Sequence, residues 1–466
     1  MSEQEKLSEK KHGFLEINSY SISQGLINFN VGAFGAYVFF FYETEVLLNV
    51  ILLALAMSLY SAWDAINDPW MGNLTDRPFK FTEKWGRRFP WVAIGVFPWA
   101  ILYIFIFTTP DVDPNTGGWL IFTYLLIILI IYDTFYTVWN INSEALMPFK
   151  FRNFDERRKV SGIKAIWGII GLVLGIAVPP LFVEYGVKSS YVTQAIILAI
   201  IIVILGILML PGHREDKALI IQYLKSAKEL RKNVSFFKAL VEALKKKNFL
   251  IMITLHFLYS ILTGLLIASG NYILRYNLKE DPSAFLLVML AYLIVSLLTI
   301  PIWIKVAQKV NNNKLMITIG SIVMGTMTLL IMLVDSLTML IIVVALIGLG
   351  GGIFFVMQDV INADVIDEAV VLDGERREGT YFGIKFFIGR FSNVFVFVAI
   401  AVIHIATGFN PVIENQTPLA LLGIKIHMSL IPGIALLIGA IIFWKWYDLT
   451  PEKMDQVKDK IIQLKF

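Results

Sequence analysis

The sequence predicts an all-helical protein that crosses a membrane about twelve times. Hydrophobic residues make up 57% of the chain, and only 16% of the residues are charged, against about 25% in soluble domains. Apolar runs of roughly 20 residues, each long enough to span a bilayer as a helix, recur along the whole sequence. A chain of 466 residues has room for about a dozen such spans joined by short loops.

One long polar connection separates the sixth apolar run from the seventh. We expect spans at about 22–42, 46–68, 90–109, 118–143, 161–183, 191–211, 249–274, 285–306, 314–334, 338–360, 380–406 and 418–446. The expected parts are an N-terminal six-helix bundle, a basic central loop, a C-terminal six-helix bundle and a tail, at residues 1–211, 212–248, 249–446 and 447–466. The polar N-terminus has no signal-peptide core or cleavage site, so we expect the first span to be retained.

Charges in the connections predict the orientation. The even-numbered connections are rich in Lys and Arg, within 77–88, 150–159 and 212–248, whereas odd-numbered connections carry acids such as Glu43 and Asp111. Because cytoplasmic loops carry the excess of Lys and Arg, we expect both termini and the central loop to be cytoplasmic.

The central loop and the six-plus-six arrangement favour a transporter. Residues 233–247 have the pattern of a short amphipathic helix on the membrane surface, with its apolar side formed by Phe236, Phe237, Leu240 and Leu244. Two six-span halves are typical of secondary transporters that bind their solute near the membrane midplane. We find no repeated pore loop or selectivity-filter segment, which disfavours a channel.

Composition and motifs exclude several other classes. The chain has no cysteine, and therefore no disulfide or thiolate metal site. No Walker lysine motif follows the glycines at 348–352, and no nucleophile–base pair stands out, so we expect neither ATP drive nor an enzyme, and no cofactor. The net charge of +4 is explained by loop position and does not indicate nucleic-acid binding. His256 and His404 occur singly in separate spans, which favours packed or hydrogen-bonded imidazoles over metal ligands.

Two carboxylates at the end of the second span indicate a polar site inside the membrane. Asp64 and Asp68 lie four residues apart, so they share one face of a helix, with Asn67 beside them. Acids in a span are expensive facing lipid and must face protein or water. Oxygen ligands of this kind are what a cation site uses.

These residues belong to longer motifs that resemble a known family. WDAINDPWMGNLTDR at 63–77, GRRFPW at 86–91, NSEALMPFKFRNFDERRKVSG at 142–162 and ADVIDEAVVLDGERREG at 363–379 resemble the glycoside–pentoside–hexuronide:cation symporter family of the major facilitator superfamily. The likeness runs over nearly the whole chain. It implies sugars or sugar-like solutes driven by Na+, H+ or Li+ through alternating access.

The resemblance implies a cation site between the second and fourth spans. Its residues would be Asp64, Asn67, Asp68, Thr137 and Asn140. Such hard oxygen ligands suit Na+, with Asp64 and Asp68 as its charged ligands, and two close carboxylates can instead hold a proton because both do not easily ionise. The alternative is that both acids pair with a basic group and only stabilise the fold.

The resemblance also implies a solute site in which this chain departs from its relatives. Two acids of the melibiose-type sugar site are replaced by Asn28 and Asn140, and its Arg by Lys164, with Asn30 as the alternative to Asn28. Further candidate solute contacts are Tyr136, Trp139, Lys385 and Arg390. Fewer acids and a retained cation predict that acidic sugars are bound better than neutral ones.

The resemblance places a third group, a cytoplasmic gate, on opposite halves. Asp364 and Asp367 would meet Arg157 and one of Arg376 and Arg377. Ion pairs that form in one state and break in the other would make this a bistable element. The alternative is solvated loop charges that contribute about 0–1 kcal/mol a pair.

The sequence thus predicts a multi-pass symporter of the cell membrane that couples Na+ or H+ entry to uptake of a sugar, glycoside or hexuronide, and we expect a monomer. Two other hypotheses stay open: a cation-coupled lysolipid or amphiphile transporter, and a non-coupled facilitator or sensor of the same fold.

Overall fold

The computed structural model describes residues 12–75, 79–151, 154–217, 220–221, 236–374 and 378–463. Within these ranges every regular element is a helix, and twelve helices are long and apolar enough to cross a membrane. The predicted all-helical fold with twelve spans is confirmed, and the cytoplasmic orientation of the termini stays a prediction. The chain divides into two compact units, Met1–Lys232 and Asn233–Phe466, and the boundary lies inside the predicted central loop.

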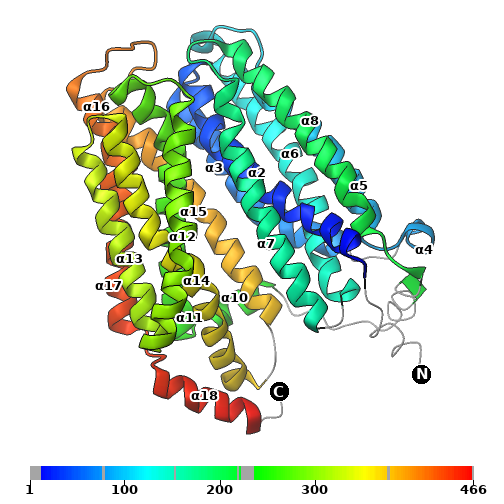
Figure 1. The fold of residues 1–466 in the computed structure, drawn as a ribbon. Helices are drawn as coiled ribbons and strands as arrows, with labels where there is room; N and C mark the ends of the chain where they lie inside the picture. Colours follow the sequence, from blue (N-terminus) through cyan, green and yellow to red (C-terminus); the bar gives the residue numbers. More distant parts are fainter. Residues whose placement is uncertain are drawn as a thin grey trace. The chain divides into compact units, whose positions relative to one another are not determined.

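The elements of each unit follow the predicted spans (Figure 1). The N-terminal unit contains α2 (Phe14–Thr44), α3 (Val50–Thr75), α4 (Thr82–Trp85), α5 (Phe89–Phe107), α6 (Pro114–Lys150), α7 (Phe154–Ala177), η1 (Pro179–Leu181) and α8 (Lys188–His213). The C-terminal unit contains α10 (Phe236–Leu244), α11 (Lys247–Tyr272), η2 (Ile273–Leu278), α12 (Ala284–Val310), α13 (Asn313–Leu329), η3 (Leu330–Leu333), α14 (Leu337–Asp373), α15 (Glu378–Thr407), α16 (Pro418–Lys425), η4 (Ile426–Leu430), α17 (Ile431–Trp446) and α18 (Pro451–Gln463).

Several helices are longer than their apolar runs. The first span begins at Phe14 instead of about 22, and the fourth continues to Lys150 instead of about 143. The second passes through Pro69 and ends at Thr75. Hydropathy locates only the lipid-facing part of a helix, whereas backbone hydrogen bonding continues through polar residues at its ends.

Glycines bring α2 and α7 unusually close together. A Cβ built on Gly171 would lie 1.9 Å from the carbonyl oxygen of Gly25, and one on Gly175 would lie 2.2 Å from that of Phe29. Such Gly-x-x-x-Gly spacing lets two membrane helices pack backbone to backbone. The other main contacts of this unit are α2 with α8, α5 with α6 and α8, and α3 with α6.

In the C-terminal unit, α14 packs against α12 and α13 through a run of glycines. A Cβ on Gly350 would lie 2.7 Å from Met324 N of α13, and one on Gly352 would lie 2.4 Å from Thr299 Oγ1 of α12. Helix α17 packs on α11 and α13, and α15 packs on α11. The predicted amphipathic helix of the central loop forms as α10, which contacts α11 and α15. Ala239 and Ala243 are buried on this helix.

The connection between α3 and α5 is fixed by an acid and a base. The carboxylate of Glu215, just after α8, accepts hydrogen bonds from the backbone N–H groups of Arg87, Arg88 and Phe89 at the start of α5. Arg88 is only 6% exposed, and its Nη1 donates to Asn142 Oδ1 of α6 at 2.8 Å and to Thr75 Oγ1 of α3 at 3.4 Å. This connection therefore ties α3, α5, α6 and the end of α8 together.

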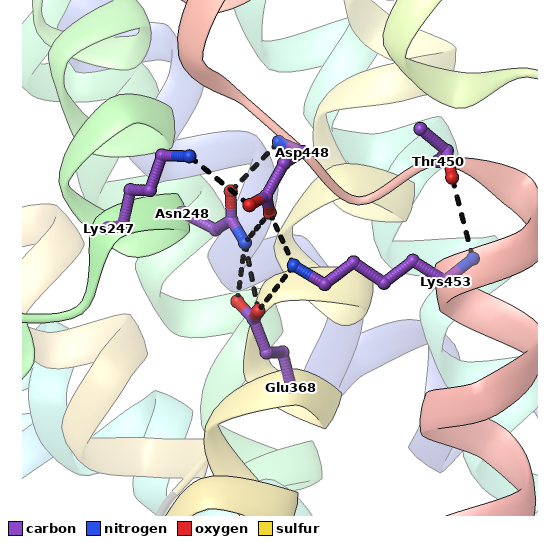
Figure 2. A network of polar contacts seen from close by, with 6 residues as sticks. All are labelled: Lys247, Asn248, Glu368, Asp448, Thr450 and Lys453. Atoms are coloured by element: carbon purple, nitrogen blue, oxygen red, sulfur yellow. Dashed lines mark hydrogen bonds and ion pairs between the residues drawn. The ribbon is translucent and has the colours of Figure 1, made fainter.

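The C-terminal helix α18 is held by a polar network (Figure 2). Asn248 Nδ2 donates to Asp448 Oδ1 at 2.7 Å and to both carboxylate oxygens of Glu368 on α14. Lys453 Nζ of α18 lies 2.8 Å from Asp448 Oδ1, and Lys247 Nζ lies 3.2 Å from Asp448 Oδ2. Met454 and Val457 are buried on the same helix. Asp448 is thus the common partner that joins α11 and α18.

Candidate functional site

The two acids of the second span lie on α3 at its contact with α6. Asp64 and Asp68 are half-buried, and Asn67 between them is fully buried. Pro69 follows Asp68 inside the helix and has no N–H to donate to the carbonyl of Ala65, so the helix is locally weakened beside the acids. Helix α3 thus carries two carboxylates and an amide within little more than one turn.

Helix α6 carries a stripe of polar side chains along one face. Asp133, Thr137, Asn140 and Glu144 follow one another at spacings of three or four residues, which places them on one face. Thr137 Oγ1 donates to Asp68 Oδ1 at 3.0 Å. Thr137 and Asp68, two candidates for the predicted cation site, are therefore in contact.

Asp133 is a member of this group that the motif comparison did not single out. It is 1% exposed, and its Oδ2 accepts a 3.0 Å hydrogen bond from Asn67 Nδ2. The backbone carbonyl of Asp133 is also 3.3 Å from Asn67 Nδ2. The signal was available in the sequence, because any acid within an apolar span is a candidate functional residue. Asp133 lies one helical turn before Thr137.

Two amide oxygens at this contact have no hydrogen-bond partner among the described residues. Asn67 Oδ1 and Asn140 Oδ1 are both buried from solvent. A buried carbonyl-type oxygen is costly to leave unsatisfied, and neutral oxygens together with carboxylates are the donor set that Na+ prefers. In the described part of the chain no three His, Asp or Glu side chains cluster closely enough to hold a metal. A bound monovalent cation would therefore rely on neutral oxygens as much as on acids.

Lys164 of α7 is neutralised by an acid. Its Nζ lies 2.6 Å from Oε1 of Glu144, the last residue of the α6 stripe. Lys164 is 8% exposed, and its Nζ is 5.8 Å from the ring centre of Tyr20. The sequence argument counted Lys164 as an uncompensated positive charge, and this assumption is corrected by the ion pair. Its side chain nevertheless lies beside the polar stripe of α6.

The two candidate asparagines of α2 face different helices. Asn28 Nδ2 donates to the carbonyl of Gly168 on α7 at 3.0 Å, and its Oδ1 accepts from Gln24. Asn30 Oδ1 instead accepts from the hydroxyl of Tyr132 on α6. Asn28 is therefore the one on the side of Lys164's helix.

The two aromatic candidates of α6 have different surroundings. Trp139 is completely buried, with its ring centre 5.4 Å from that of Trp99 on α5. A Cβ on Gly95 would lie 2.8 Å from the Trp139 backbone N, so α5 approaches this residue closely. Tyr136 is half-buried and lies edge-on to Trp139 at 5.6 Å. In this conformation Trp139 packs inside the unit, while Tyr136 remains partly accessible.

The C-terminal unit carries its own polar group around Lys385 of α15. Lys385 is 6% exposed, and a Cβ on Gly389, one turn later, would lie 3.2 Å from His256 Nε2 of α11. His256 Nδ1 lies 2.6 Å from Gln358 Nε2 of α14, so His256 is hydrogen-bonded as predicted. Arg390 follows Gly389 and is half-buried.

The comparisons with known proteins identify the family. Residues 19–451 match the family described as MFS/sugar transport protein. The chain belongs to this family.

Several relatives are similar to this member of the MFS/sugar transport family over most of its length. The isoprimeverose transporter of Lactiplantibacillus pentosus is 22% identical, covering 96% of this chain and 91% of the relative. The glucuronide carrier protein homolog of Escherichia coli is 22% identical over 95% of this chain and 94% of the relative. The sodium-dependent lysophosphatidylcholine symporter 1 of Gallus gallus is 23% identical over 87% and 80%.

Solved structures support the same fold for this MFS/sugar transport protein. The inward-open xylose transporter XylE from E. coli superposes with a TM-score of 0.60, covering 95% of this chain and 99% of that chain at 14% identity. This likeness concerns the fold, and together with the twelve spans it establishes a multi-pass membrane protein of the major facilitator type.

The candidate gate residues of this family member have partners within their own units. Arg157 Nε and Nη2 donate to the carbonyls of Phe151 and Pro148 at 2.6 and 2.9 Å. Asp364 Oδ2 accepts from Asn313 Nδ2 at 2.8 Å, and Asp367 is half-buried on the same helix. Arg376 and Arg377 lie outside the described residues. The gate remains a prediction.

Proposed function

We propose that the protein is a secondary symporter that couples entry of Na+ or H+ to uptake of a glycoside or hexuronide by alternating access. The observation that carries this proposal is the oxygen-rich contact between α3 and α6. Asn67 of α3 donates to Asp133 of α6, and Thr137 of α6 donates to Asp68 of α3, one turn after Asp64. Buried acids with open amide oxygens nearby are a donor set for a small cation.

The arrangement supports a coupling role because it brings the carboxylates of Asp68 and Asp133 to one helix contact. Two neighbouring carboxylates repel each other less when a proton or a metal cation is shared between them. Occupancy by a cation would neutralise this repulsion and favour the state in which α3 and α6 are packed together. A ligand shifts a conformational equilibrium only through such a difference in affinity between states.

The solute site is proposed beside it, at the end of the polar stripe. Lys164 donates and Glu144 accepts, which is the pairing that sugar hydroxyls can replace on both sides. The similarity to a glucuronide carrier and to an isoprimeverose transporter supports glycosides and hexuronides as the substrate class. A hexuronide carboxylate would compete with Glu144 for Lys164.

Transport in proteoliposomes tests this function. Labelled glycosides and hexuronides would be offered with an imposed Na+ gradient, an imposed proton gradient, or neither. We expect accumulation above equilibrium for at least one sugar under one of the two gradients, and only equilibration without a gradient. Equilibration under all three conditions would contradict symport and favour a non-coupled facilitator.

A second candidate function, transport of an amphiphile, is favoured by a specific cavity. A cavity in the C-terminal unit is lined almost entirely by apolar side chains. Its lining includes Leu266, Phe285, Val288, Met324 and Met428, and none of the predicted solute residues lines it. Such a lining suits an acyl chain better than a sugar, and a lysophosphatidylcholine symporter is among the relatives.

One substitution separates the two candidates. Val288, 3% exposed, lines the apolar cavity, and Val288→Phe would fill part of it. An amphiphile transporter should lose uptake of labelled lysophosphatidylcholine in this variant. A sugar symporter should show no lysolipid uptake in either protein and unchanged sugar uptake.

A further inference from the structure

Two buried histidines from separate spans contact each other directly in the C-terminal unit. His404 Nε2 of α15 lies 3.1 Å from His427 Nε2 of η4. His427 Nδ1 in turn lies 2.7 Å from Ser269 Oγ of α11. One chain of hydrogen bonds therefore joins three helical segments, and these residues belong to neither the carboxylate contact nor the Lys385 group.

The pair is sealed from solvent by aromatic rings. His404 is 1% exposed and His427 is 0% exposed. The ring of Phe409 stacks on His404 with a centroid distance of 4.2 Å, and the ring of Tyr272 lies 5.0 Å from His404 and 6.0 Å from His427. Both η4, which carries His427, and η2, which follows Tyr272, are π-helical. Such segments are rare and occur frequently at functional sites.

The short contact between the two ring nitrogens limits which protonation states fit it. A bond between two imidazole nitrogens needs a single hydrogen, donated by one Nε2 and accepted by the lone pair of the other. Two neutral rings satisfy this requirement. If both rings became imidazolium, both nitrogens would carry hydrogens, the bond would be lost, and two positive charges would repel each other.

The surroundings offer little to stabilise a positive charge. The titratable residues on the elements packed around the pair include Tyr272 of α11, which contacts both rings, Arg275 and Tyr276 of η2, Lys425 of α16 and Asp335 after η3. Two of these are themselves cationic, and Lys425 Nζ is 3.4 Å from the carbonyl oxygen of Met332. The aromatic rings thus keep water away from the pair as long as the pocket stays packed.

We propose that His404 and His427 form a proton-binding site that latches this end of the C-terminal unit. While the pair is neutral, it holds α11, α15 and η4 together. Protonation requires water to reach the rings, so the opened form binds more protons than the packed form. Acid consequently shifts the equilibrium toward the opened form, by up to about tenfold per pH unit for each proton taken up.

The loop charges assign the compartment that this latch senses. His404 lies near the end of α15 and His427 lies just after α16, so the pair flanks the connection between these two helices, which is the eleventh connection and is predicted to face the outside of the cell. The ligand of this site is therefore a proton from the external medium. A site here would make the outer end of the C-terminal unit responsive to external pH whichever ion drives transport.

Nitrogen NMR of the intact protein in nanodiscs tests the bond itself. The chain has five histidines, so imidazoles labelled with ¹⁵N can be assigned one by one from His→Gln variants. We expect a scalar coupling across the hydrogen bond between the Nε2 atoms of His404 and His427 at pH 8, and its loss at pH 5. No coupling at pH 8, or an unchanged coupling at pH 5, would overturn the proposal.

Cysteine labelling tests the opening. The chain has no native cysteine, so Ala268→Cys, at a position 3% exposed beside Ser269, reports this end of α11, and Ala199→Cys on α8, at a position 5% exposed, is the matched control. The labelling rate of the first divided by that of the second should rise several-fold from pH 8 to pH 5. This ratio corrects for the pH dependence of thiol reactivity that the two cysteines share.

Histidine variants assign that rise to the pair. In the His404→Gln, His427→Gln double variant the ratio should be independent of pH, whereas His256→Gln, at a histidine of the same unit outside the pair, should retain the rise. A flat ratio in the unaltered protein would refute the latch, as would an equal rise in the double variant. If the double variant fails to fold, the NMR measurement on the unaltered protein still decides.

Discussion

Asn67 of α3 donates its side-chain amide to Asp133 of α6, with Nδ2 3.0 Å from Oδ2. This bond joins two helices through residues 66 positions apart in the chain. It also orients the amide so that its own oxygen stays open within the contact. A single asparagine thereby orients one acid and leaves a neutral oxygen that could bind the proposed cation.

Asp133→Asn should therefore impair coupling as severely as Asp68→Asn. Each change removes one charge from the contact while keeping nearly the same volume, so gradient-driven accumulation should fall at least tenfold while exchange of labelled solute across the membrane persists. The measurement is accumulation and counterflow in the same proteoliposomes. Asp111→Asn, at an exposed loop position, is the control and should accumulate normally. Normal accumulation in both Asp133→Asn and Asp68→Asn would exclude a coupling role for the contact.

The ion pair of Lys164 with Glu144 predicts how charge selectivity can be changed. Removing the acid with Glu144→Gln leaves Lys164 available, so the affinity for a hexuronide relative to its matched hexose should rise about tenfold, or about 1.4 kcal/mol. Lys164→Gln should lower that ratio. Calorimetry with the matched sugar pair measures both. Equal affinity ratios in the two variants would mean that the proposed solute site does not select on charge.

The cap formed by Glu215 predicts a strongly unequal response of two glycines. Gly86 has φ +93°, and a Cβ there would lie 2.7 Å from the Glu215 carboxyl carbon, so Gly86→Ala should destabilise the unit by about 1–3 kcal/mol. Gly162→Ala meets open space on α7 and should be neutral or slightly stabilising because alanine favours helix. Thermal unfolding in detergent compares them. A Gly86→Ala protein as stable as the Gly162→Ala protein would disprove the cap.

The network around Asp448 predicts an acid-sensitive attachment of α18. Partial burial alone would raise the pKa of Asp448, but hydrogen bonds from Lys453, Asn248 and Lys247 lower this pKa to about 2. Since the folded-state pKa is below the usual value of about 3.9, the stabilisation is complete above about pH 4 and is lost as the pH falls toward 2.

Hydrogen exchange of α18 measures this attachment. Its amides should exchange faster as the pH falls from 4 to 2, after correction for intrinsic rates, and Asp448→Asn should show the faster corrected rate already at pH 6. The effect should be modest, about 0–1 kcal/mol, because the group is partly exposed. Asp459→Asn, at an exposed position of α18, is the control. Identical corrected exchange in Asp448→Asn and the unaltered protein would rule out the attachment.

The sequence by itself determined the class and the number of spans, and it identified the first half of the proposed cation site. Hydropathy is a local property of about 20 consecutive residues, so the twelve helices could be counted without knowing their packing. Asp64, Asn67 and Asp68 lie within five consecutive residues of one helix, and the 3.6-residue period suffices to place the two acids on one face. What hydropathy could not give was where the helices end, because polar residues extend them.

Only the tertiary structure decided which distant residues meet. Asp133 is hydrogen-bonded to Asn67, and Lys164 is paired with Glu144. His404 contacts His427. Each of these pairs joins separate elements, and the spacing within one helix carries no information about the face that another helix presents to it. The glycine contacts of α2 with α7 and of α14 with its neighbours help to set those faces, because small residues let the backbones of two helices approach closely only along the side that carries them.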